Sequence, residues 1–490
     1  MVTELPATRT EAVQSTNMSF LLVTPFPFKS RNDYVTNIDG IISRHSGSKA
    51  KHGVCYPTGL AYISSILKQN GFETYLIDPQ PQNYSLSEIE RYANLADVIL
   101  IPISHTRYDD ITSWLRLYKD KIRIGVSNFA SICSDELLKS GSCDIVIQGE
   151  NEYTCLELAK AFKVSTSPDL SKIAGISFLK NGIVFNTVER PLPKNLDRIP
   201  FPDRQGLNLN VYTDIAFRGS PTAFVLTARG CVYKCTFCST HQMYDYKAYY
   251  RSPENVVNEI EEVIHKYGIT SFFFIDDTFT LLPRRVERIC DLIVQRNLGI
   301  QWACLGRIDL INDDMLMKMK RAGCIEIRFG IESGDDQILM NIRKNLTVSQ
   351  VELGIQLMRK HKMRYSLFFM IGNPGETRNS IRRTIRFSKK LNASIVSFNI
   401  STPLPGSPLF DLYKEKIGKD QIKTFDTLST DFSFCELPPK VLRRYLIFAY
   451  VSYYFRPAFL FQCLFEMISR PREIFKTTAF FLRQAMVILK

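Results

Sequence analysis

Short apolar runs alternate with amphipathic segments through the first third of the chain. Five of the apolar runs have the length and composition of buried strands, at residues 20–28, 73–78, 96–104, 121–127 and 143–150. Between most of them the apolar residues recur at helical spacing. In residues 57–72 they share one helix face, and Gly71 is placed as a C-terminal cap. Strands that alternate with helices predict a doubly wound parallel sheet, which binds ligands at the carboxyl ends of its strands.

A turn signal and a run of prolines follow this first series. Residues 176–188 read as a β-hairpin with its turn at Asn181-Gly182. Residues 190–204 contain four prolines, which make a stiff and extended connection. We therefore expect three successive segments: a flexible N-terminus (1–18), a Rossmann-like domain (19–165), and a hairpin with a proline-rich linker (166–215).

A second series of strand-like runs begins after the linker. Its six members lie at residues 222–230, 271–277, 301–308, 324–333, 364–372 and 394–401, and helix-like segments separate them. Six β/α units predict a partial (β/α)6 barrel over residues 216–415, with the loops at the carboxyl ends of the strands building the site. The expected fold class is therefore α/β in both domains, followed by a helical C-terminal region over residues 416–490.

Length and cysteine usage are those of an ordinary multidomain protein. A chain of 490 residues is too long for one compact core, so two or three domains are expected. The polar N-terminus lacks the apolar segment of a signal peptide. The twelve cysteines are scattered except for one triplet, which favours a reducing, cytoplasmic location.

The net charge of +13 is concentrated near the C-terminus, because residues 441–490 hold eight Lys or Arg against two Glu. The same residues are rich in Phe, Tyr, Leu and Ile, but Arg456 and Pro457 interrupt the apolar span, so no transmembrane helix is expected. Two interpretations stay open: helices packed on the open side of the barrel, and amphipathic helices lying on the inner face of an anionic membrane. No recognition module accompanies the charge, so nucleic acid is not an expected partner.

Three cysteines, Cys231, Cys235 and Cys238, lie within eight residues directly after a strand. Convergent thiolates bind zinc, copper(I) or iron–sulfur clusters. A structural zinc ion needs four ligands, and His241 is the nearest candidate for the fourth. Zinc ribbons usually pair two Cys-x-x-Cys knuckles, however, and this sequence has no second knuckle. On a four-iron cluster, three cysteines leave one iron open to an exogenous ligand.

The spacing Cys-x-x-x-Cys-x-x-Cys, with the aromatic Phe237 before the last cysteine, resembles the signature of the radical S-adenosylmethionine (SAM) enzymes. The resemblance covers residues 224–408 and agrees with the barrel expected there. It implies that the three cysteines ligate a [4Fe–4S] cluster and that SAM completes the open iron. It also implies that an electron donor such as flavodoxin or ferredoxin drives cleavage of SAM to a 5′-deoxyadenosyl radical.

The same resemblance implies a set of SAM-binding residues at the ends of the barrel strands. Asp276 and Asp277 stand where the family often has Gly-Gly-Glu, which this chain lacks, and capping of the following turn is the alternative role. Arg307 is expected to pair with a carboxylate, either that of SAM or one in the barrel itself. The full set is Phe237, Asp276, Asp277, Arg307, Glu332, Ser333, Gly372 and Pro374.

The first domain resembles the cobalamin-binding domain that precedes the barrel in one radical SAM subclass. Its Gly-Glu-Asn-Glu stretch departs by one residue from the subclass's Gly-Glu-Gly-Glu, and "GVSNFAS" replaces a GGPH-like stretch. The cobalt-ligating histidine loop of other cobalamin carriers is missing, and His105 is expected to be a solvated loop residue. The implied cobalamin contacts are Thr58, Gly59, Leu60, Ser104, Gly125, Gly149, Glu150, Asn151 and Glu152.

Together the two resemblances imply cobalamin-dependent methylation of an unactivated carbon in a small-molecule or lipid substrate. The alternative is a radical SAM cyclase, dehydrogenase or carbon-skeleton enzyme that transfers no methyl group, and a structural zinc protein is a remote third. Trp302, Cys304 and Cys324 are expected to pack the barrel, because buried free cysteine behaves as a small hydrophobe.

Overall fold

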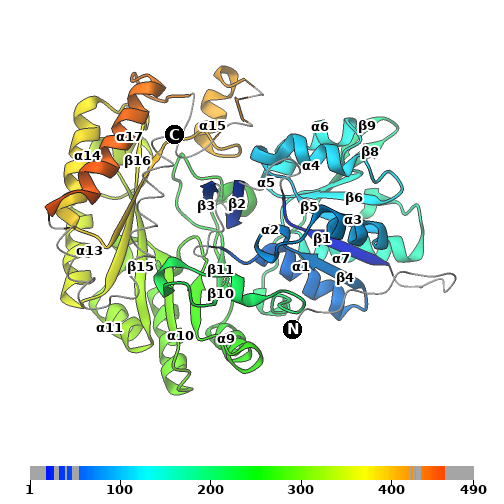
Figure 1. Cartoon of the computed structure of the whole chain (residues 1–490), viewed down its shortest axis with the longest axis horizontal. Coiled ribbons are helices and arrows are strands. Elements are labelled where there is room, and N and C mark those ends of the chain that lie inside the picture. Colours follow the sequence, from blue (N-terminus) through cyan, green and yellow to red (C-terminus); the bar gives the residue numbers. More distant parts are fainter. Residues whose placement is uncertain are drawn as a thin grey trace. The chain divides into compact units, whose positions relative to one another are not determined.

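The chain folds into two compact units, each assembled from more than one segment. The first comprises the chain up to Gly230 together with Ser239–Phe273, and the second comprises Cys231–Cys238 together with the chain from Phe274 onward. The computed structural model describes residues 18–26, 54–418 and 432–457, with the short stretches 33–38, 41–46, 421–422, 425 and 459 (Figure 1). The predicted flexible N-terminus lies outside the described residues, apart from Met18.

The first unit contains a seven-stranded sheet in the order β4-β1-β5-β6-β7-β8-β9 (Figure 1). The first five strands of this order are parallel, and β8 and β9 add an antiparallel hairpin at one edge. The parallel strands follow the 2-1-3-4-5 order of one doubly wound fold, so the chain reverses direction across the sheet between β1 and β5. The bounds are β1 Ser19–Val23, β4 Glu73–Ile77, β5 Val98–Pro102, β6 Ile122–Val126, β7 Ile145–Ile147, β8 Ile176–Lys180 and β9 Ile183–Asn186.

Apolar strands and amphipathic helices give this sheet its core. Every residue of β1 is buried, and Leu21 belongs with Ile99 and Trp114 to one apolar cluster. Helix α3 starts at a capping box between Ser85 and Glu88, which satisfies the free amides of its first turn. The helices of the unit are α1 Thr58–Gln69, α2 Pro79–Gln82, α3 Leu86–Leu95, α4 Tyr108–Leu115, α5 Asn128–Ile132, α6 Ser134–Lys139, α7 Glu152–Val164, α8 His241–Tyr244 and α9 Pro253–Tyr267.

The second large sheet has six strands in the order β10-β13-β14-β15-β16-β17. Strands β14 to β17 pair in parallel register. The bounds are β10 Thr222–Val225, β13 Ser271–Phe274, β14 Gln301–Gly306, β15 Cys324–Glu332, β16 Arg364–Ile371 and β17 Ile395–Ile400. The associated helices are α10 Pro283–Gln295, α11 Asp313–Arg321, α12 Asp336–Asn341, α13 Val348–Lys360, α14 Arg378–Leu391, α15 Pro408–Tyr413 and α17 Pro439–Tyr454.

The predicted fold class is confirmed, and the differences from the prediction are local. Strand β1 ends at Val23 although the apolar run continues, because the prolines at positions 25 and 27 have no amide hydrogen for the ladder. An antiparallel pair, β2 Asp33–Ile38 and β3 Ile41–Ser46, occupies a stretch in which no strands were predicted. Trp302, Cys304 and Cys324 are buried, as predicted.

Helix α17 packs against the outer strand β17 of the second sheet. It lies beside α14 (Figure 1). The hydroxyl of Tyr453 donates a hydrogen bond of 2.7 Å to the carbonyl of Ala393, just before that strand. Residues 439–454 therefore follow the first of the two interpretations of the C-terminal region, in which its helices pack on the barrel. Most of the basic and aromatic residues beyond them, 460–490, lie outside the described part of the chain. Among the described residues, no helix combines the length and apolar character needed to cross a membrane.

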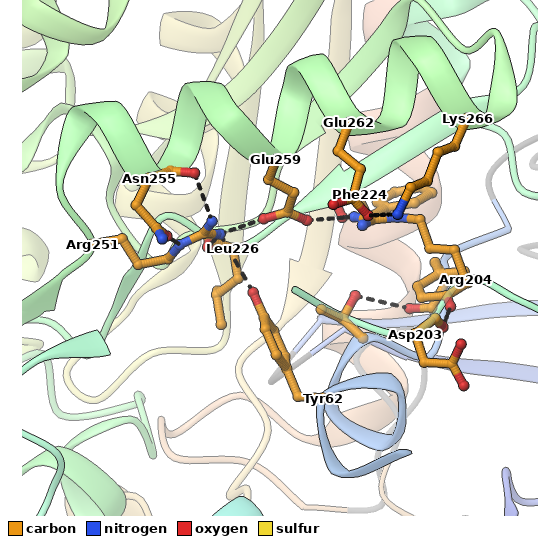
Figure 2. A network of polar contacts seen from close by, with 12 residues as sticks. Tyr62, Asp203, Arg204, Phe224, Leu226, Arg251, Asn255, Glu259, Glu262 and Lys266 are labelled. Carbon is orange, nitrogen blue, oxygen red and sulfur yellow. Dashed lines mark hydrogen bonds and ion pairs between the residues drawn. The ribbon is translucent and has the colours of Figure 1, made fainter. Parts of the chain in front are cut away.

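A buried ionic network ties the proline-rich linker to helices α1 and α9 within the first unit (Figure 2). Glu259 is fully buried and accepts hydrogen bonds from Arg204 at 2.6 Å and from Arg251. Burial opposes the charge of Glu259, but the two guanidinium groups outweigh it and lower its pKa. Arg204 also donates to the carbonyl of Phe224 in β10 at 3.2 Å, so the end of the linker is fixed to that strand.

Candidate functional site

The loop that carries the three cysteines is held by backbone hydrogen bonds within the second unit. The amide of Thr236 donates to the carbonyl of Ile342 at 3.0 Å, and the carbonyl of Thr236 accepts from the amide of Leu409 at 2.8 Å. Cys235 is buried, whereas Cys231 and Cys238 are partly exposed, and none of the three forms a disulfide. The Cys231 thiol lies 3.6 Å from the hydroxyl of Thr278, directly after the predicted Asp276-Asp277 pair.

Charged side chains of the second unit act electrostatically on Cys235. Glu332, the last residue of β15, accepts a hydrogen bond of 2.8 Å from Lys344, and both side chains are at most one-tenth exposed. Burial raises the pKa of the Cys235 thiol, and the nearby cations of Lys344 and Arg307 act in the opposite direction. Burial also opposes the Lys344 ammonium, but Glu332 and Cys235 outweigh it and raise its pKa, so Lys344 is charged at neutral pH.

The backbone is strained where Glu332 meets this group. Its φ angle is +68°, and the pairing of β15 with β16 shifts register between Gly330 and Glu332. A non-glycine residue in the left-handed region costs energy that the surrounding contacts must offset. The ion pair with Lys344 supplies such a contact and holds the Glu332 carboxylate at the carboxyl end of its strand.

Arg307 joins the end of β14 to the cysteine loop. Its guanidinium binds both carboxylate oxygens of Asp309 at 3.0 Å and donates to the carbonyls of Lys344 and Asn345 at 3.0 and 3.1 Å. It also lies 3.6 Å from the ring centre of Tyr233, between the first two cysteines, in a cation–π contact. Of the two roles predicted for Arg307, the ion pair inside the barrel is the one that these contacts occupy.

The other residues predicted to contact SAM are more dispersed. Asp276 is fully buried and Asp277 exposed. The hydroxyl of Ser333 lies 3.1 Å from that of Thr384 in α14, so it helps to pack that helix. The Phe237 ring lies 5.8 Å from the Lys344 nitrogen.

Gly372 and Pro374 occupy the loop after β16. Gly372 has φ +86°, and a Cβ atom there would lie 2.8 Å from a methyl carbon of Leu442, so glycine is required for packing as well as for conformation. The carbonyl of Pro374 accepts a hydrogen bond of 3.0 Å from Asn341.

The cysteine loop has the chemistry of an iron–sulfur site. A cluster held by three thiolates is anionic, and two cations, Arg307 and Lys344, act on Cys235. Within the described part of the chain, no three His, Cys, Asp or Glu side chains are grouped so as to hold a single metal ion. A four-iron cluster binds each of its three thiolates through a different iron, so its protein ligands are not expected to converge on one point.

The predicted cobalamin contacts lie along the carboxyl edge of the first sheet and at the start of α1. A Cβ atom added to Gly59 or to Gly149 would meet no other atom within 4 Å, so there is open space beside both backbones. The side-chain oxygen of Asn151 is buried and has no hydrogen-bond partner among the described residues. Thr58 and Leu60, on the same turn as Gly59, are buried. An open edge with an unsatisfied buried acceptor is suited to a ligand with amide donors, as cobalamin has.

At this edge the prediction for His105 is wrong, and Gly125 has a structural reason other than cobalamin. His105 was expected to be solvated, but it is only 9% exposed and its ring lies 5.7 Å from that of Phe129, because the short helical turn after β5 folds it inward. Gly125 lies inside β6, and a Cβ atom there would lie 3.1 Å from the Cys143 sulfur, so close packing accounts for this glycine. Ser104 is buried, with its hydroxyl 3.1 Å from that of Thr106.

Glu150 and Glu152 point to a residue that the sequence did not single out. Both carboxylates bind the guanidinium of Arg229, which comes just before the cysteine loop in the chain. Burial raises the pKa of Glu150, with Glu152 adding to the effect, whereas Arg229 outweighs burial and lowers the pKa of Glu152. Lys344, Tyr233 and Arg229 are the polar residues that sequence analysis missed. Tyr233 lies inside the cysteine motif and Arg229 just before it, so their positions could have drawn attention to them, whereas the position of Lys344 could not.

The chain matches a known family over part of its length. The family described as the Radical SAM superfamily matches residues 225–388. This range includes the cysteine loop and the strand ends at Arg307, Glu332 and Gly372. An uncharacterized methyltransferase of Pyrococcus horikoshii is 30% identical over 419 residues, which are 84% of this chain and 90% of that protein. An anaerobic magnesium-protoporphyrin IX monomethyl ester cyclase of Cereibacter sphaeroides is 25% identical over 82% of this chain and 66% of its own length.

The fold of both units also matches a solved structure. The radical S-adenosylmethionine methyltransferase TsrM from Kitasatospora setae, solved with cobalamin and a [4Fe–4S] cluster bound, superposes with a TM-score of 0.66. The match covers 82% of this chain and 78% of that one at 17% identity. At this identity the likeness describes the fold, which is a Rossmann-like sheet followed by a partial barrel.

Proposed function

The chain belongs to the radical SAM superfamily, and from this premise we propose that it is a cobalamin-dependent methyltransferase that acts on an unactivated carbon. The observation that carries the proposal is the union, in one chain, of a doubly wound sheet with an open carboxyl edge and a barrel whose first loop carries three cysteines outside any disulfide. The methyltransferase relative that spans both parts supports it.

At the barrel, Cys231, Cys235 and Cys238 would hold a [4Fe–4S] cluster and leave one iron for SAM. When bound, the cluster and SAM together supply one-electron chemistry, which converts SAM to a radical that removes a hydrogen atom from carbon. Lys344 and Arg307 favour the anionic form of the Cys235 thiol electrostatically. Glu332, fixed by Lys344, offers its second carboxylate oxygen as a hydrogen-bond acceptor at the strand end, where SAM carries an ammonium group and two ribose hydroxyls.

At the first sheet, the carboxyl edge would hold cobalamin, which supplies a methyl carrier when bound. Gly59 and Gly149 leave room for close approach of a large ring, and Asn151 offers an acceptor to an amide of the corrin periphery. His105 is turned into the core against Phe129, so we assign it no role as a cobalt ligand.

The test is anaerobic reconstitution of the full chain, followed by purification in the presence of hydroxocobalamin. The expected product contains four irons per chain and shows the visible spectrum of a corrinoid. Incubation with SAM labelled in its methyl group and a reductant should then transfer the label to a small-molecule or lipid acceptor. Protein that loads iron but retains no cobalamin would contradict methyl transfer by this route.

A second candidate is a radical SAM cyclase or related enzyme that transfers no methyl group. The similarity to the cyclase of Cereibacter sphaeroides, which also spans both parts of this chain, favours keeping it. The same experiment separates the two candidates, because a cyclase would form 5′-deoxyadenosine and an altered substrate without the methyl label.

The proposal also includes an electron donor for the cluster and membrane contact through the C-terminal residues. A small electron-transfer protein such as flavodoxin or ferredoxin would reduce the cluster, and replacing it by dithionite should support turnover. Membrane contact through residues 460–490 stays a prediction. If it is correct, the protein should sediment with anionic vesicles at low salt and less so at high salt. Equal recovery in the supernatant at low and high salt would contradict it.

A further inference from the structure

Glu150 contacts residues on both sides of the cysteine loop, and all of them belong to the first unit. One carboxylate oxygen accepts from the guanidinium of Arg229, two positions before Cys231. The other accepts a hydrogen bond of 2.9 Å from the hydroxyl of Tyr244, six positions after Cys238. A single side chain between β7 and α7 therefore joins the chain entering the loop to the chain leaving it.

Glu152 completes the grip on Arg229. Its two carboxylate oxygens accept from the guanidinium at 2.6 and 3.3 Å. The side chains of Arg229, Glu150 and Glu152 are at most 8% exposed, and the ring of Tyr62 covers the guanidinium at 5.2 Å. A buried ion group of this kind is costly to form and contributes little net stability, but removing one partner leaves an unpaired buried charge. Such a group is better suited to fixing a geometry than to stabilising a fold.

The two flanks of the loop are also pressed together at their base. Arg229, in β11 (Ala228–Arg229), pairs with Tyr249 in β12 (Tyr249–Tyr250). Gly230 has φ +82°, and a Cβ atom there would lie 2.3 Å from the carbonyl oxygen of Lys247 and 2.8 Å from Cβ of Tyr244. The chain thus leaves and re-enters the first unit through a closed neck, which is formed by β11, Gly230, Tyr244 and β12. The two glutamates bind this neck through Arg229 and Tyr244.

We propose that Glu150 and Glu152 are positioning residues for the cysteine loop: through Arg229 and Tyr244 they fix its two ends, so that the three thiols are held at the spacing that a cluster requires. This assigns the two glutamates of the Gly-Glu-Asn-Glu stretch to the iron–sulfur site of the barrel rather than to cobalamin, and it leaves Gly149 and Asn151 at the cobalamin edge. The inference rests on the proposed function only through the cluster, and it is independent of cobalamin binding and of the reaction outcome.

The experiment compares iron release from reconstituted full-length protein. Three proteins are treated with an iron chelator under anaerobic conditions: the unaltered chain, the variant Glu150→Gln/Glu152→Gln, and the variant Glu150→Gln/Glu152→Gln/Arg229→Met. The last variant leaves no buried charge, so it keeps the test meaningful if the double variant fails to fold. Residues that orient metal ligands from outside the ligand set typically change metal affinity by 10- to 100-fold, so we expect iron release to be faster by about ten-fold or more. Tyr244→Phe, which frees only the exit side, should give a smaller acceleration in the same direction.

Two controls separate positioning from a general loss of stability. Glu157, on the same helix α7, has a half-exposed carboxylate that pairs with Arg190, and Glu157→Gln should release iron at the unaltered rate. Leu138→Ala opens the apolar core of the same unit at α6, so it should lower the unfolding temperature without changing iron release well below that temperature.

Electron paramagnetic resonance spectra of the reduced proteins give a second readout. We expect altered g-values for the triple variant and unchanged ones for both controls, because only the former changes the geometry of the loop. A folded triple variant with unaltered iron release and unaltered g-values would overturn the inference and leave the proposed function intact. Failure of the unaltered chain to take up iron would overturn both.

Discussion

The hydroxyl of Tyr454 donates a hydrogen bond of 2.6 Å to the carbonyl of Val396 and accepts one of 3.0 Å from the amide of the same residue. Tyr450, one helical turn earlier, makes the same pair of bonds with Phe398, at 3.0 and 3.1 Å. These two residues of β17 are alternate residues on the last strand of the six-stranded order, so each phenol satisfies backbone groups that a further strand would otherwise bind. Helix α17 therefore closes a sheet edge with side-chain hydroxyls.

Replacing Tyr454 by Phe should destabilise the protein by about 1 to 3 kcal/mol, because it removes one hydroxyl and leaves an amide and a carbonyl of Val396 without their partner. Denaturant unfolding followed by circular dichroism measures the change. Tyr445→Phe, on the same helix and half-buried, is the matched control and should change stability by less than about 0.5 kcal/mol. Equal stability of the two variants would show that the edge contacts carry no weight.

Replacing Cys235 by Ala should abolish formation of 5′-deoxyadenosine and reduce the iron content of the reconstituted protein, because two thiolates cannot retain the cluster. The measurement is chromatography of the nucleoside products together with iron analysis. Cys133→Ala, a half-buried thiol outside the loop, should keep both near the level of the unaltered protein. Activity that survives in Cys235→Ala would contradict the ligand assignment.

Replacing Lys344 by Met should make the reduction potential of the cluster more negative. Reduction adds negative charge to the site, and Lys344 is a buried cation that acts on Cys235, so its loss makes the reduced state less favourable. A shift on the order of 60 mV corresponds to a ten-fold change in a one-electron equilibrium. Redox titration monitored by electron paramagnetic resonance measures it, and Lys344→Arg should shift the potential less. A potential unchanged in both variants would place Lys344 outside the electrostatics of the cluster.

Because of Glu376, the free energy of unfolding of the protein should decrease as the pH rises. The Glu376 carboxylate is buried in the loop after β16 and accepts from the amides of Gly372 and Asn373, and burial raises its pKa from 4.5 to about 8. The folded state therefore retains a proton that the unfolded state loses, so the contribution of this group is complete below pH 4.5 and is lost as pH rises to about 8.

The measurement is the free energy of unfolding at pH 6 and pH 8.5, for the unaltered protein and for Glu376→Gln. Between these values the variant should gain about 1 to 3 kcal/mol relative to the unaltered chain, because glutamine does not titrate. Glu415→Gln, on an exposed turn, should show the unaltered pH dependence. Parallel pH profiles for all three proteins would contradict the raised pKa.

The fold could be predicted because its signals are local. Apolar runs such as those of β5 and β16 identify buried strands wherever they occur, and the spacing of three cysteines is readable within eight residues. The partners could not be predicted in this way. Arg229 and Glu150 are 79 positions apart, and Lys344 meets Glu332 across the helix α12 that separates them in the chain. Pattern and spacing show which residues can do chemistry, whereas pairing over such distances depends on the packed fold.

The division of the chain between the two units has a consequence for its synthesis. The first unit needs Ser239–Phe273, and the chain reaches these residues only after it has passed through the eight residues of the cysteine loop. On the ribosome, where domains tend to fold in order from the N-terminus, the Rossmann-like sheet can form early, but the neck that receives Arg229 and Tyr244 can close only later. The loop is then translated and flanked on both sides before most of the barrel strands exist. Ile342 and Leu409, whose backbones hold Thr236 of the loop, are translated later still. We infer that stable metal insertion follows synthesis of the barrel, so nascent chains stalled before residue 274 should retain less iron than the full chain.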